Sequence, residues 1–248
     1  MTRVHTSYLV CTTARSGSTL LCEALKSTGL AGAPGEFFGS NPTWTGIQPW
    51  DASGVVEYVA ELMQRFSTPN GVFGAKLMWP QLIALTHQLR LLPEYRDVRA
   101  CELPAAVFPN LHVIYLTRRD KLRQAISYLK AWQTGIWLVR QKAAPTTWRE
   151  TRFDRAGIEH ALLRLNGWEG LWETYFQGCG VHPLRLVYEE LIEAFEETTI
   201  GVLKHLGIPL PTEIVVRAPR IVRQADAQSE EWVRRYQALE RIRGEQTT

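Results

Sequence analysis

The chain has 248 residues, of which 45% are hydrophobic, 10% aromatic and 21% charged, and its formal net charge is +3. This composition is typical of a globular protein with enough apolar material for a substantial core. The charge is too small to indicate a nucleic-acid-binding surface, but it suits an enzyme with a basic pocket for a small polyanion.

The first twenty residues contain no apolar run as long as a signal peptide or a membrane span. No close-spaced pair occurs among the four cysteines, Cys11, Cys22, Cys101 and Cys179, and the histidines form no metal-ligand pattern with them. We therefore expect a cytoplasmic protein with free thiols, no metal site and no membrane span.

Three short apolar runs, at residues 7–13, 71–79 and 111–117, are typical of buried parallel strands. Helical patterns follow them over residues 19–27, 81–91 and 120–132, and a fourth strand candidate at 183–191 precedes a helical pattern over 192–206. This alternation predicts an α/β fold, with a P-loop-like central parallel sheet and helices on both faces. We expect a single domain over residues 1–248.

Two further segments have distinct patterns. Residues 155–176 carry apolar side chains at helical spacing, which predicts a long core helix. Residues 32–54 form an irregular stretch rich in Gly, Pro and Trp, and a loop of this length is usually functional or mobile. Trp132 and Trp137 are candidates for core packing or for lining a ligand pocket, and we favour the core.

The segment TTARSGSTLLCEAL, residues 12–25, has the order strand, glycine-containing loop, helix. The first amide groups of a helix lack internal acceptors, so this geometry predicts an anion site. Gly17 allows close approach of a phosphate, and the hydroxyl groups of Ser16, Ser18 and Thr19 add donors. A nucleoside triphosphate loop has a lysine after its last glycine, whereas here Arg15 precedes Gly17. The alternative is an ordinary N-capped helix.

A second strand-to-helix junction reads TRRD at residues 117–120. Ser127 lies nearly two helical turns after Asp120 and therefore shares a helix face with it. Arg118 at the end of the strand and Ser127 on the helix are placed to bind one phosphate. Because ligands of parallel sheets bind beyond the carboxyl ends of the strands, both anion sites should lie at one edge. The sequence thus predicts a nucleotide phosphorylated at two places.

The pairing of ARSGSTLL with TRRD and the later AIS resembles the phosphosulfate loop and the 3′-phosphate motif of sulfotransferases. Three further stretches, GEFF at residues 35–38, GAKLMW at 74–79 and RQADAQSEEWVRRY at 223–236, extend the likeness over nearly the whole chain. Together these segments resemble the trehalose 2-sulfotransferase family.

The resemblance implies transfer of a sulfuryl group from 3′-phosphoadenosine 5′-phosphosulfate (PAPS) to a hydroxyl group of a carbohydrate or small metabolite, without a metal. It implies that Arg15 and Ser16, Gly17, Ser18 and Thr19 hold the 5′-phosphosulfate, and that Arg118 and Ser127 hold the 3′-phosphate. Arg119 is an alternative to Arg118, because the sequence does not define the end of the strand to one residue.

For catalysis, the resemblance assigns Glu36 as general base, and Arg15 would stabilise the leaving oxygen. Because Glu36 is flanked by aromatic residues, we expect partial desolvation to raise its proton affinity. Lys76 either touches the donor or pairs with a carboxylate. Ser229 is the expected N-cap of a helix, and the basic segment before it, with Arg223 and Gln224, is either a lid or a linker.

On the acceptor side, the resemblance and the aromatic content of the loop make Phe37, Pro49 and Trp50 candidate contacts. Trehalose-recognising members carry polar side chains where this chain has Ala14, Ala33 and Gly35. A site without those hydrogen-bonding groups loses affinity for a polyhydroxyl acceptor, so we expect a retained donor half and an altered acceptor half. The family likeness also implies a homodimer, and no nucleic-acid partner is expected.

Two other functions compete with sulfuryl transfer. A P-loop kinase-like phosphotransferase would use ATP and magnesium, and the absence of a lysine after Gly17 argues against it. A nucleotide-binding regulatory protein without turnover would not need Glu36 beside two aromatic residues.

Overall fold

The computed structural model describes residues 3–39, 45, 47, 54–138, 150–217 and 226–245. The chain forms two compact units. The first consists of Met1–Thr117 and Trp168–Pro219, and the second of Arg118–Gly167 and Arg220–Thr248. The expectation of a single functional domain stays a prediction.

The first unit contains a four-stranded parallel sheet in the order β2-β1-β3-β4. Its strands are β1 (Thr6–Thr12), β2 (Val72–Met78), β3 (Leu111–Thr117) and β4 (Leu184–Val187). The predicted parallel sheet is confirmed. Thr12 pairs with Met78 on one side and Leu116 on the other, so the carboxyl ends of the three longer strands lie level.

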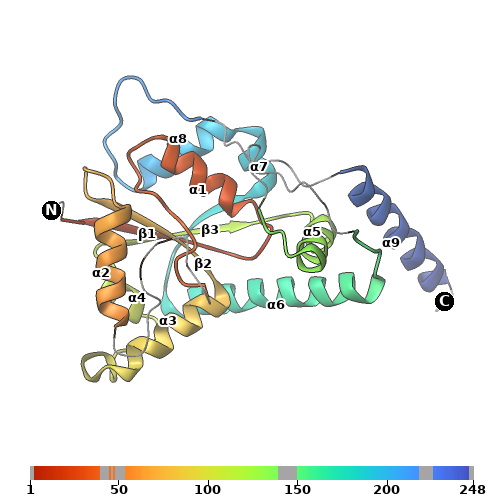
Figure 1. The fold of residues 1–248 in the computed structure, drawn as a ribbon, viewed down its shortest axis with the longest axis horizontal. Coiled ribbons are helices and arrows are strands. Elements are labelled where there is room, and N and C mark those ends of the chain that lie inside the picture. Colours follow the sequence, from red (N-terminus) through yellow and green to blue (C-terminus); the bar gives the residue numbers. More distant parts are fainter. Residues whose placement is uncertain are drawn as a thin grey trace. The chain divides into compact units, whose positions relative to one another are not determined.

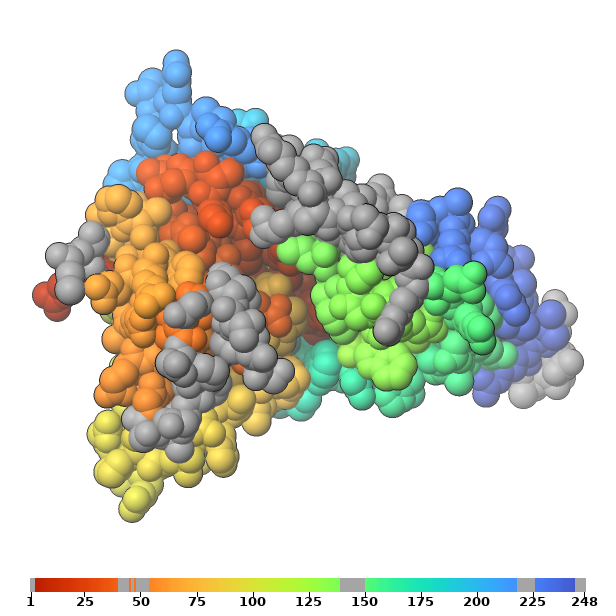
Figure 2. All heavy atoms as spheres, in the orientation of Figure 1, coloured from red at the N-terminus to blue at the C-terminus, as the bar shows by residue number. Residues whose placement is uncertain are grey.

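Helices cover both faces of the sheet, as the sequence predicts (Figure 1). Tyr8 and Val10 of β1 pack in one apolar cluster with α1 (Ser18–Ser27) and α8 (Phe195–His205). Leu9 and Cys11 face the opposite cluster, which includes α2 (Val55–Phe66), α3 (Trp79–Leu91) and α4 (Leu103–Val107). A short 3-10 helix, η2 (Pro93–Tyr95), follows α3. The outer surfaces of α2 and α3 appear in orange and yellow in Figure 2.

The fourth strand is shorter than predicted. The sequence indicated an extended run over residues 183–191, but β4 ends at Val187 and α7 (Tyr188–Glu193) begins at once. Glu189 and Glu190 lie in the first turn of α7, where carboxylates interact favourably with the helix dipole. The helix after β4 is accordingly divided into α7 and α8.

The second unit contains α5 (Lys121–Thr134), α9 (Ala227–Glu245) and the beginning of α6 (Arg155–Cys179). The long helix predicted from residue 155 is confirmed, and its buried positions repeat at Ile158, Ala161 and Leu165. Arg123 of α5 pairs with Glu230 of α9 at 2.6 Å, and Lys130 pairs with Asp226 at 2.8 Å. These ion pairs join α5 to the amino-terminal end of α9.

The predicted N-cap of α9 is wrong. Ser229 lies inside the first turn, and its backbone N–H donates to Oδ1 of Asp226 at 2.8 Å, which makes Asp226 the capping residue. The Ser229 hydroxyl also donates to the same oxygen at 2.8 Å. In the sequence, Asp226 was recognisable as an N-cap candidate, because aspartate is a preferred N-cap residue and directly precedes the helix.

Core packing was also the wrong expectation for two tryptophans. Trp132 and Trp137 are 68% and 45% exposed. Trp137 contacts the ring of Tyr128 edge-on, with centroids 5.5 Å apart. The four cysteines are free, as expected. Within the described ranges, no helix is long and apolar enough to cross a membrane.

Candidate functional site

The loop between β1 and α1 has the backbone geometry of an anion site. Arg15 and Gly17 both have left-handed conformations, with φ of 63° and 88°. Gly17 is the N-cap residue of α1 and makes no side-chain capping hydrogen bond. Gly17 has no side chain to occupy the first amide groups of α1, so this helix N-terminus suits an anionic ligand, while the N-capped helix that the sequence left open stays an alternative.

Gly17 has a packing role that the sequence did not reveal. A Cβ atom at this position would lie 2.3 Å from Cδ2 of Tyr188, well inside contact distance. The positive φ of 88° also disfavours any other residue. Gly17 is thus required by the close approach of the Tyr188 ring as well as by the turn, and not by a phosphate alone.

The hydroxyl groups of the loop do not all face outward. Ser16 is completely buried, and its Oγ lies 2.5 Å from Oγ1 of Thr12, which donates to the carbonyl oxygen of Leu116 at 2.8 Å. This chain of hydrogen bonds secures the loop to β1 and β3. The expectation that the Ser16 hydroxyl points to the ligand is not met in this structure. Ser18 is also buried, whereas Thr19 is half-buried.

Residues 168–179 of α6 support the carboxyl end of β1, from the apolar cluster that contains Leu9 and Cys11. Nε1 of Trp172, a fully buried residue, donates to the carbonyl oxygen of Thr12 at 3.1 Å. The Thr13 hydroxyl donates to Oε1 of Glu169 at 3.4 Å. The start of the loop is therefore held by side chains of a helix more than a hundred residues away, for which the sequence gives no local signal.

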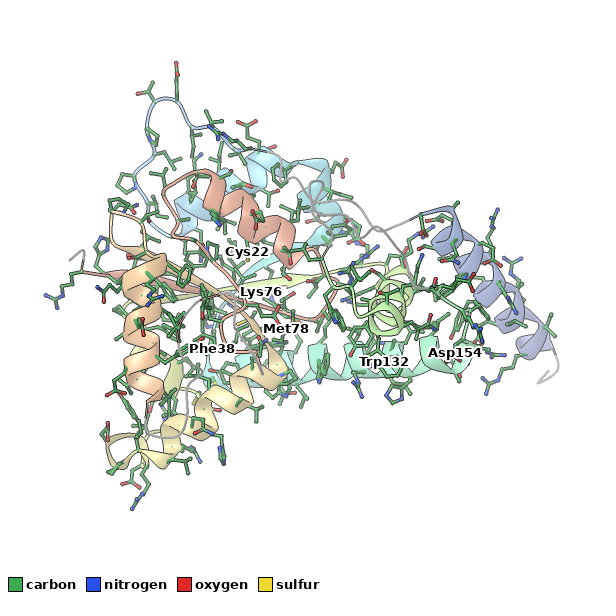
Figure 3. The ribbon with its side chains drawn as sticks, in the orientation of Figure 1. Cys22, Phe38, Lys76, Met78, Trp132 and Asp154 are labelled. Carbon is green, nitrogen blue, oxygen red and sulfur yellow. The ribbon has the colours of Figure 1, made fainter. Side chains whose placement is uncertain are left out.

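Glu36 lies next to the carboxyl end of β2, where Lys76 and Met78 are labelled in Figure 3. The backbone fixes this position, because Gly35 pairs with Ala75 and the Lys76 N–H donates to the Gly35 carbonyl at 2.8 Å. Nζ of Lys76 lies 2.8 Å from Oε2 of Glu36, and Nε2 of Gln81 donates to Oε1 at 2.8 Å. Both carboxylate oxygens thus have a donor.

The predicted direction of the Glu36 pKa is wrong. Burial by itself raises the pKa of Glu36, but the Lys76 charge and the hydrogen bonds from Lys76 and Gln81 outweigh it, so the pKa falls below its usual value. The carboxylate is ionised near neutral pH. The GEFF motif alone could not reveal this, because neither Lys76 nor Gln81 belongs to it.

Of the two roles left open for Lys76, pairing with a carboxylate is confirmed, and contact with the donor stays a prediction. Its ammonium pairs with Glu36, and it also donates to Oγ1 of Thr19 in the first turn of α1 at 3.4 Å. The side chain is only 11% exposed. Lys76 therefore lies between the candidate base and the anion loop, within contact of both.

Phe37, expected to contact the acceptor, is instead part of the core. Its side chain has 0% exposure and packs on Phe66 and Phe73, with centroids 4.8 Å and 5.9 Å away. The buried position of this ring does not support the predicted contact with the acceptor. The other acceptor candidates, Pro49 and Trp50, lie outside the described residues, as do Arg223 and Gln224.

In the second unit, Arg118 directly follows the last residue of β3, Thr117. Arg118 is half-buried and Arg119 is exposed, and both stay candidates for binding the 3′-phosphate. Ser127 is half-buried on α5. Asp120 caps α5 by accepting from the Arg123 N–H at 2.9 Å, so its carboxylate has a structural role.

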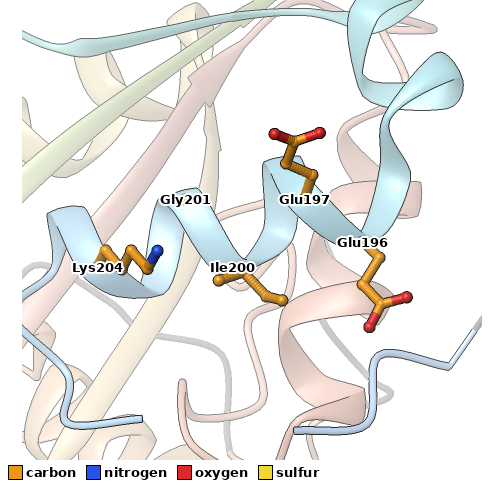
Figure 4. Close-up of a pocket in the computed structure, with 5 residues that line it drawn as sticks. All are labelled: Glu196, Glu197, Ile200, Gly201 and Lys204. Carbon is orange, nitrogen blue, oxygen red and sulfur yellow. The ribbon is translucent and has the colours of Figure 1, made fainter.

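A separate surface pocket lies on α8 and is lined by Glu196, Glu197, Ile200, Gly201 and Lys204 (Figure 4). None of the predicted site residues lines it, and its two carboxylates make it unsuited to a polyanion. Within the part of the chain that the structure describes, no group of three or more His, Cys, Asp or Glu side chains could hold a metal ion.

Comparison with known families decides the assignment. The model of the Stf0 sulphotransferase family matches residues 7–239. The chain belongs to this family. It is a sulfotransferase, as the resemblance in the sequence implied.

Two curated relatives of this sulfotransferase align over nearly their whole length. The trehalose 2-sulfotransferase of Mycobacterium tuberculosis (strain ATCC 35801 / TMC 107 / Erdman) is 32% identical, covering 96% of this chain and 97% of the relative. That of Mycolicibacterium smegmatis (strain ATCC 700084 / mc(2)155) is 31% identical over 93% and 94%. A sulfotransferase domain from the curacin biosynthetic pathway has a TM-score of 0.48 and 14% identity, covering 85% of this chain and 76% of that one.

Proposed function

We propose that this sulfotransferase moves a sulfuryl group from PAPS to a hydroxyl group of a carbohydrate or small metabolite, with Glu36 as general base. The observation that carries the proposal is the position of Lys76, whose ammonium contacts Glu36 at 2.8 Å and Thr19 of the anion loop at 3.4 Å. Because Lys76 contacts both, Glu36 and the start of α1 lie close enough to act in one reaction.

The donor fits the residues of the loop. Its 5′-phosphosulfate would meet Arg15 and the backbone of Gly17, Ser18 and Thr19 at the start of α1, where the helix dipole favours negative charge. Ser16 would contribute through its backbone, because its hydroxyl is bonded to Thr12. Arg118 and Ser127 are the proposed ligands of the 3′-phosphate.

In the reaction, Glu36 would accept the hydroxyl proton while the acceptor oxygen forms a bond to sulfur. The bond between sulfur and the bridging oxygen breaks, and the electron pair leaves with 3′-phosphoadenosine 5′-phosphate. By analogy with phosphoryl transfer, negative charge accumulates on that oxygen in a loose transition state. Arg15 and the start of α1 would stabilise this charge.

The acceptor is proposed to bind near Pro49 and Trp50. The curated relatives are trehalose 2-sulfotransferases, and a carbohydrate is the acceptor class this suggests. Ala14, Ala33 and Gly35 supply no side-chain hydrogen bond, so we expect weak use of trehalose itself. A screen of sugars and small alcohols, read by the mass increase of a sulfuryl group, identifies the acceptor.

Calorimetry tests the donor. Binding of 3′-phosphoadenosine 5′-phosphate without magnesium is expected, with much weaker binding of ATP and magnesium. Arg15→Met and Ser127→Ala should each weaken that binding, while Arg65→Met on α2 should not. A preference for ATP would end the donor assignment and restore the kinase-like alternative.

Replacement of the base tests catalysis. Glu36→Gln should keep nucleotide affinity and lose about 10²–10⁴-fold in turnover, the usual contribution of a general base. Glu57→Gln, an exposed carboxylate on α2, is the matched control and should keep full turnover. Full activity of Glu36→Gln would require another base.

We propose a cytoplasmic location, as expected from the sequence, and a homodimer, as implied by the family likeness. Light scattering of the purified chain over a range of concentrations gives the mass in solution. A monomer at all concentrations would contradict the dimer without affecting the chemistry.

A further inference from the structure

Gln81 is a buried residue that neither the donor nor the acceptor chemistry uses. It is 9% exposed and lies in the first turn of α3. Its Oε1 accepts from the backbone N–H of Met78 at 2.8 Å, and its Nε2 donates to Oε1 of Glu36 at 2.8 Å. The two partners differ in character, one a donor and one an acceptor, so the amide has a single satisfactory orientation.

The bond to Met78 is the reciprocal half of a capping box at the start of α3, in which the side chain of the third helical residue reaches back to the N-cap N–H. Gln81 is therefore fixed by the start of a helix at one end and by a carboxylate at the other. A residue needed only for the cap would not have to present a donor to Glu36, since glutamate closes a capping box equally well.

Lys76 and Gln81 hold different oxygens of the same carboxylate. Lys76 contacts Oε2, and Gln81 contacts Oε1. With both oxygens engaged and the backbone of Gly35 bonded to β2, rotation of the carboxylate is restricted. Each oxygen keeps a further lone pair, so the group can still accept a proton from an acceptor hydroxyl.

The carboxylate of Glu36 contacts the ammonium of Lys76 on β2. On α1, Cys22 interacts electrostatically with Glu36, and burial raises the pKa of this thiol to about 12. Cys22 is therefore neutral near physiological pH. From α3 the carboxylate faces the uncharged amide of Gln81. Among the described residues, Lys76 is the ionised neighbour in contact with Glu36, and a charge at position 81 would change the site strongly.

We infer that Gln81 is a positioning residue for the general base, holding Oε1 of Glu36 from the capping box of α3 and keeping a neutral donor there. This inference rests on the proposed role of Glu36. Misplacement of a reacting group by about 1 Å can cost on the order of 10²-fold in rate, which is the scale on which such a contact matters.

Gln81→Glu separates the two functions of the side chain. The new carboxylate can still accept from the Met78 N–H, so α3 keeps its cap and Tm should change little. Its second oxygen would face Oε1 of Glu36 as a like charge, which raises the pKa of Glu36. We expect kcat to fall at least about tenfold at the pH optimum, the acid limb of the pH profile to move upward, and KM for the donor to stay unchanged.

Infrared spectra of the carboxylates recorded over a range of pH give a readout that is independent of activity. The difference between the spectra of the wild-type chain and of Glu36→Gln isolates the signal of the Glu36 carboxylate. In the Gln81→Glu background the Glu36 pKa should rise by about one unit or more. Gln177→Glu, at an exposed position of α6, is the matched control and should shift neither the pKa nor kcat. Gln81→Met, which loses both bonds, should lower both Tm and kcat.

The outcomes distinguish this inference from the function on which it rests. If Glu36→Gln is inactive but Gln81→Glu keeps wild-type kcat and an unshifted Glu36 pKa, the role of Gln81 is overturned and the proposed base stands. If Glu36→Gln is fully active, the base fails and the positioning role fails with it. A loss of kcat in Gln81→Met that only follows the folded fraction, with no pH shift in Gln81→Glu, also overturns the inference.

Discussion

Nζ of Lys76 lies 2.8 Å from Oε2 of Glu36, although the two residues belong to different motifs of the sequence. Burial raises the pKa of the carboxyl group, but this pair, together with the hydrogen bond from Gln81, outweighs burial and lowers the pKa. In a sulfotransferase this keeps the candidate base ionised, and the same cation reaches Thr19 in the first turn of α1.

Removal of the cation should reverse the pKa shift. In Lys76→Met burial acts without the ion pair, so the Glu36 pKa rises and the acid limb of kcat/KM moves to higher pH. Lys26→Met, at an exposed position on α1, should leave the limb in place. An unchanged pH profile in Lys76→Met would mean that another group sets the acid limb.

The same pair has a consequence for folding. Because the folded-state pKa of Glu36 is lowered, its contribution to stability is present above the unfolded pKa and is lost as pH falls through the folded value. The difference in urea-unfolding free energy between the wild-type chain and Lys76→Met should therefore shrink on acidification. A difference independent of pH would contradict the ion pair as its source.

Gly17→Ala should be far more harmful than an alanine at another left-handed glycine. At Gly29, with φ of 69° and no atom within 4 Å of an added Cβ, alanine should cost about 1–2 kcal/mol from backbone conformation alone. At Gly17 the contact with Tyr188 at 2.3 Å should add about 1–3 kcal/mol. Thermal unfolding measures both. Tyr188→Ala in the Gly17→Ala background should recover the steric part.

Trp172→Phe should loosen the end of β1. The ring remains in the core, but the hydrogen bond from Nε1 to the Thr12 carbonyl is lost, at a cost of about 1–3 kcal/mol for a buried acceptor left without its partner. Trp132→Phe, at a side chain that is 68% exposed, should stay within about 0.5 kcal/mol of the wild-type chain. Equal effects of the two changes would contradict the assigned contact.

Asp226→Ala should destabilise the first turn of α9 by about 0.5–2 kcal/mol, because it removes the N-cap. Ser229→Ala should cost less, since Ser229 is a helical residue and not the cap. Hydrogen exchange of the amides in this turn reports the difference locally. Faster exchange in Ser229→Ala than in Asp226→Ala would restore the cap first expected from the sequence.

The spacing of apolar residues and the turn residues between segments were enough to predict the sheet and its helices. The apolar runs at β1, β2 and β3 are bounded by turns and followed by helical patterns, and these signals are local. The strand, loop and helix at residues 12–25 were also predictable, because glycine, hydroxyl residues and a helix start are consecutive in the sequence. The end of β4 was predicted wrongly because it also rests on local signals, and here the extended and helical patterns overlap near Tyr188.

The sequence by itself determined the parallel α/β architecture, the glycine-containing loop between β1 and α1 and, through its ordered motifs, the sulfotransferase family. Tertiary structure alone decided that Lys76 and Gln81 share the Glu36 carboxylate, that Tyr188 lies against Gly17, and that Phe37 is buried. The physical reason is that these contacts join residues far apart in the chain. The sign of the Glu36 pKa shift depends on burial and ion pairing together, and no local pattern gives their balance.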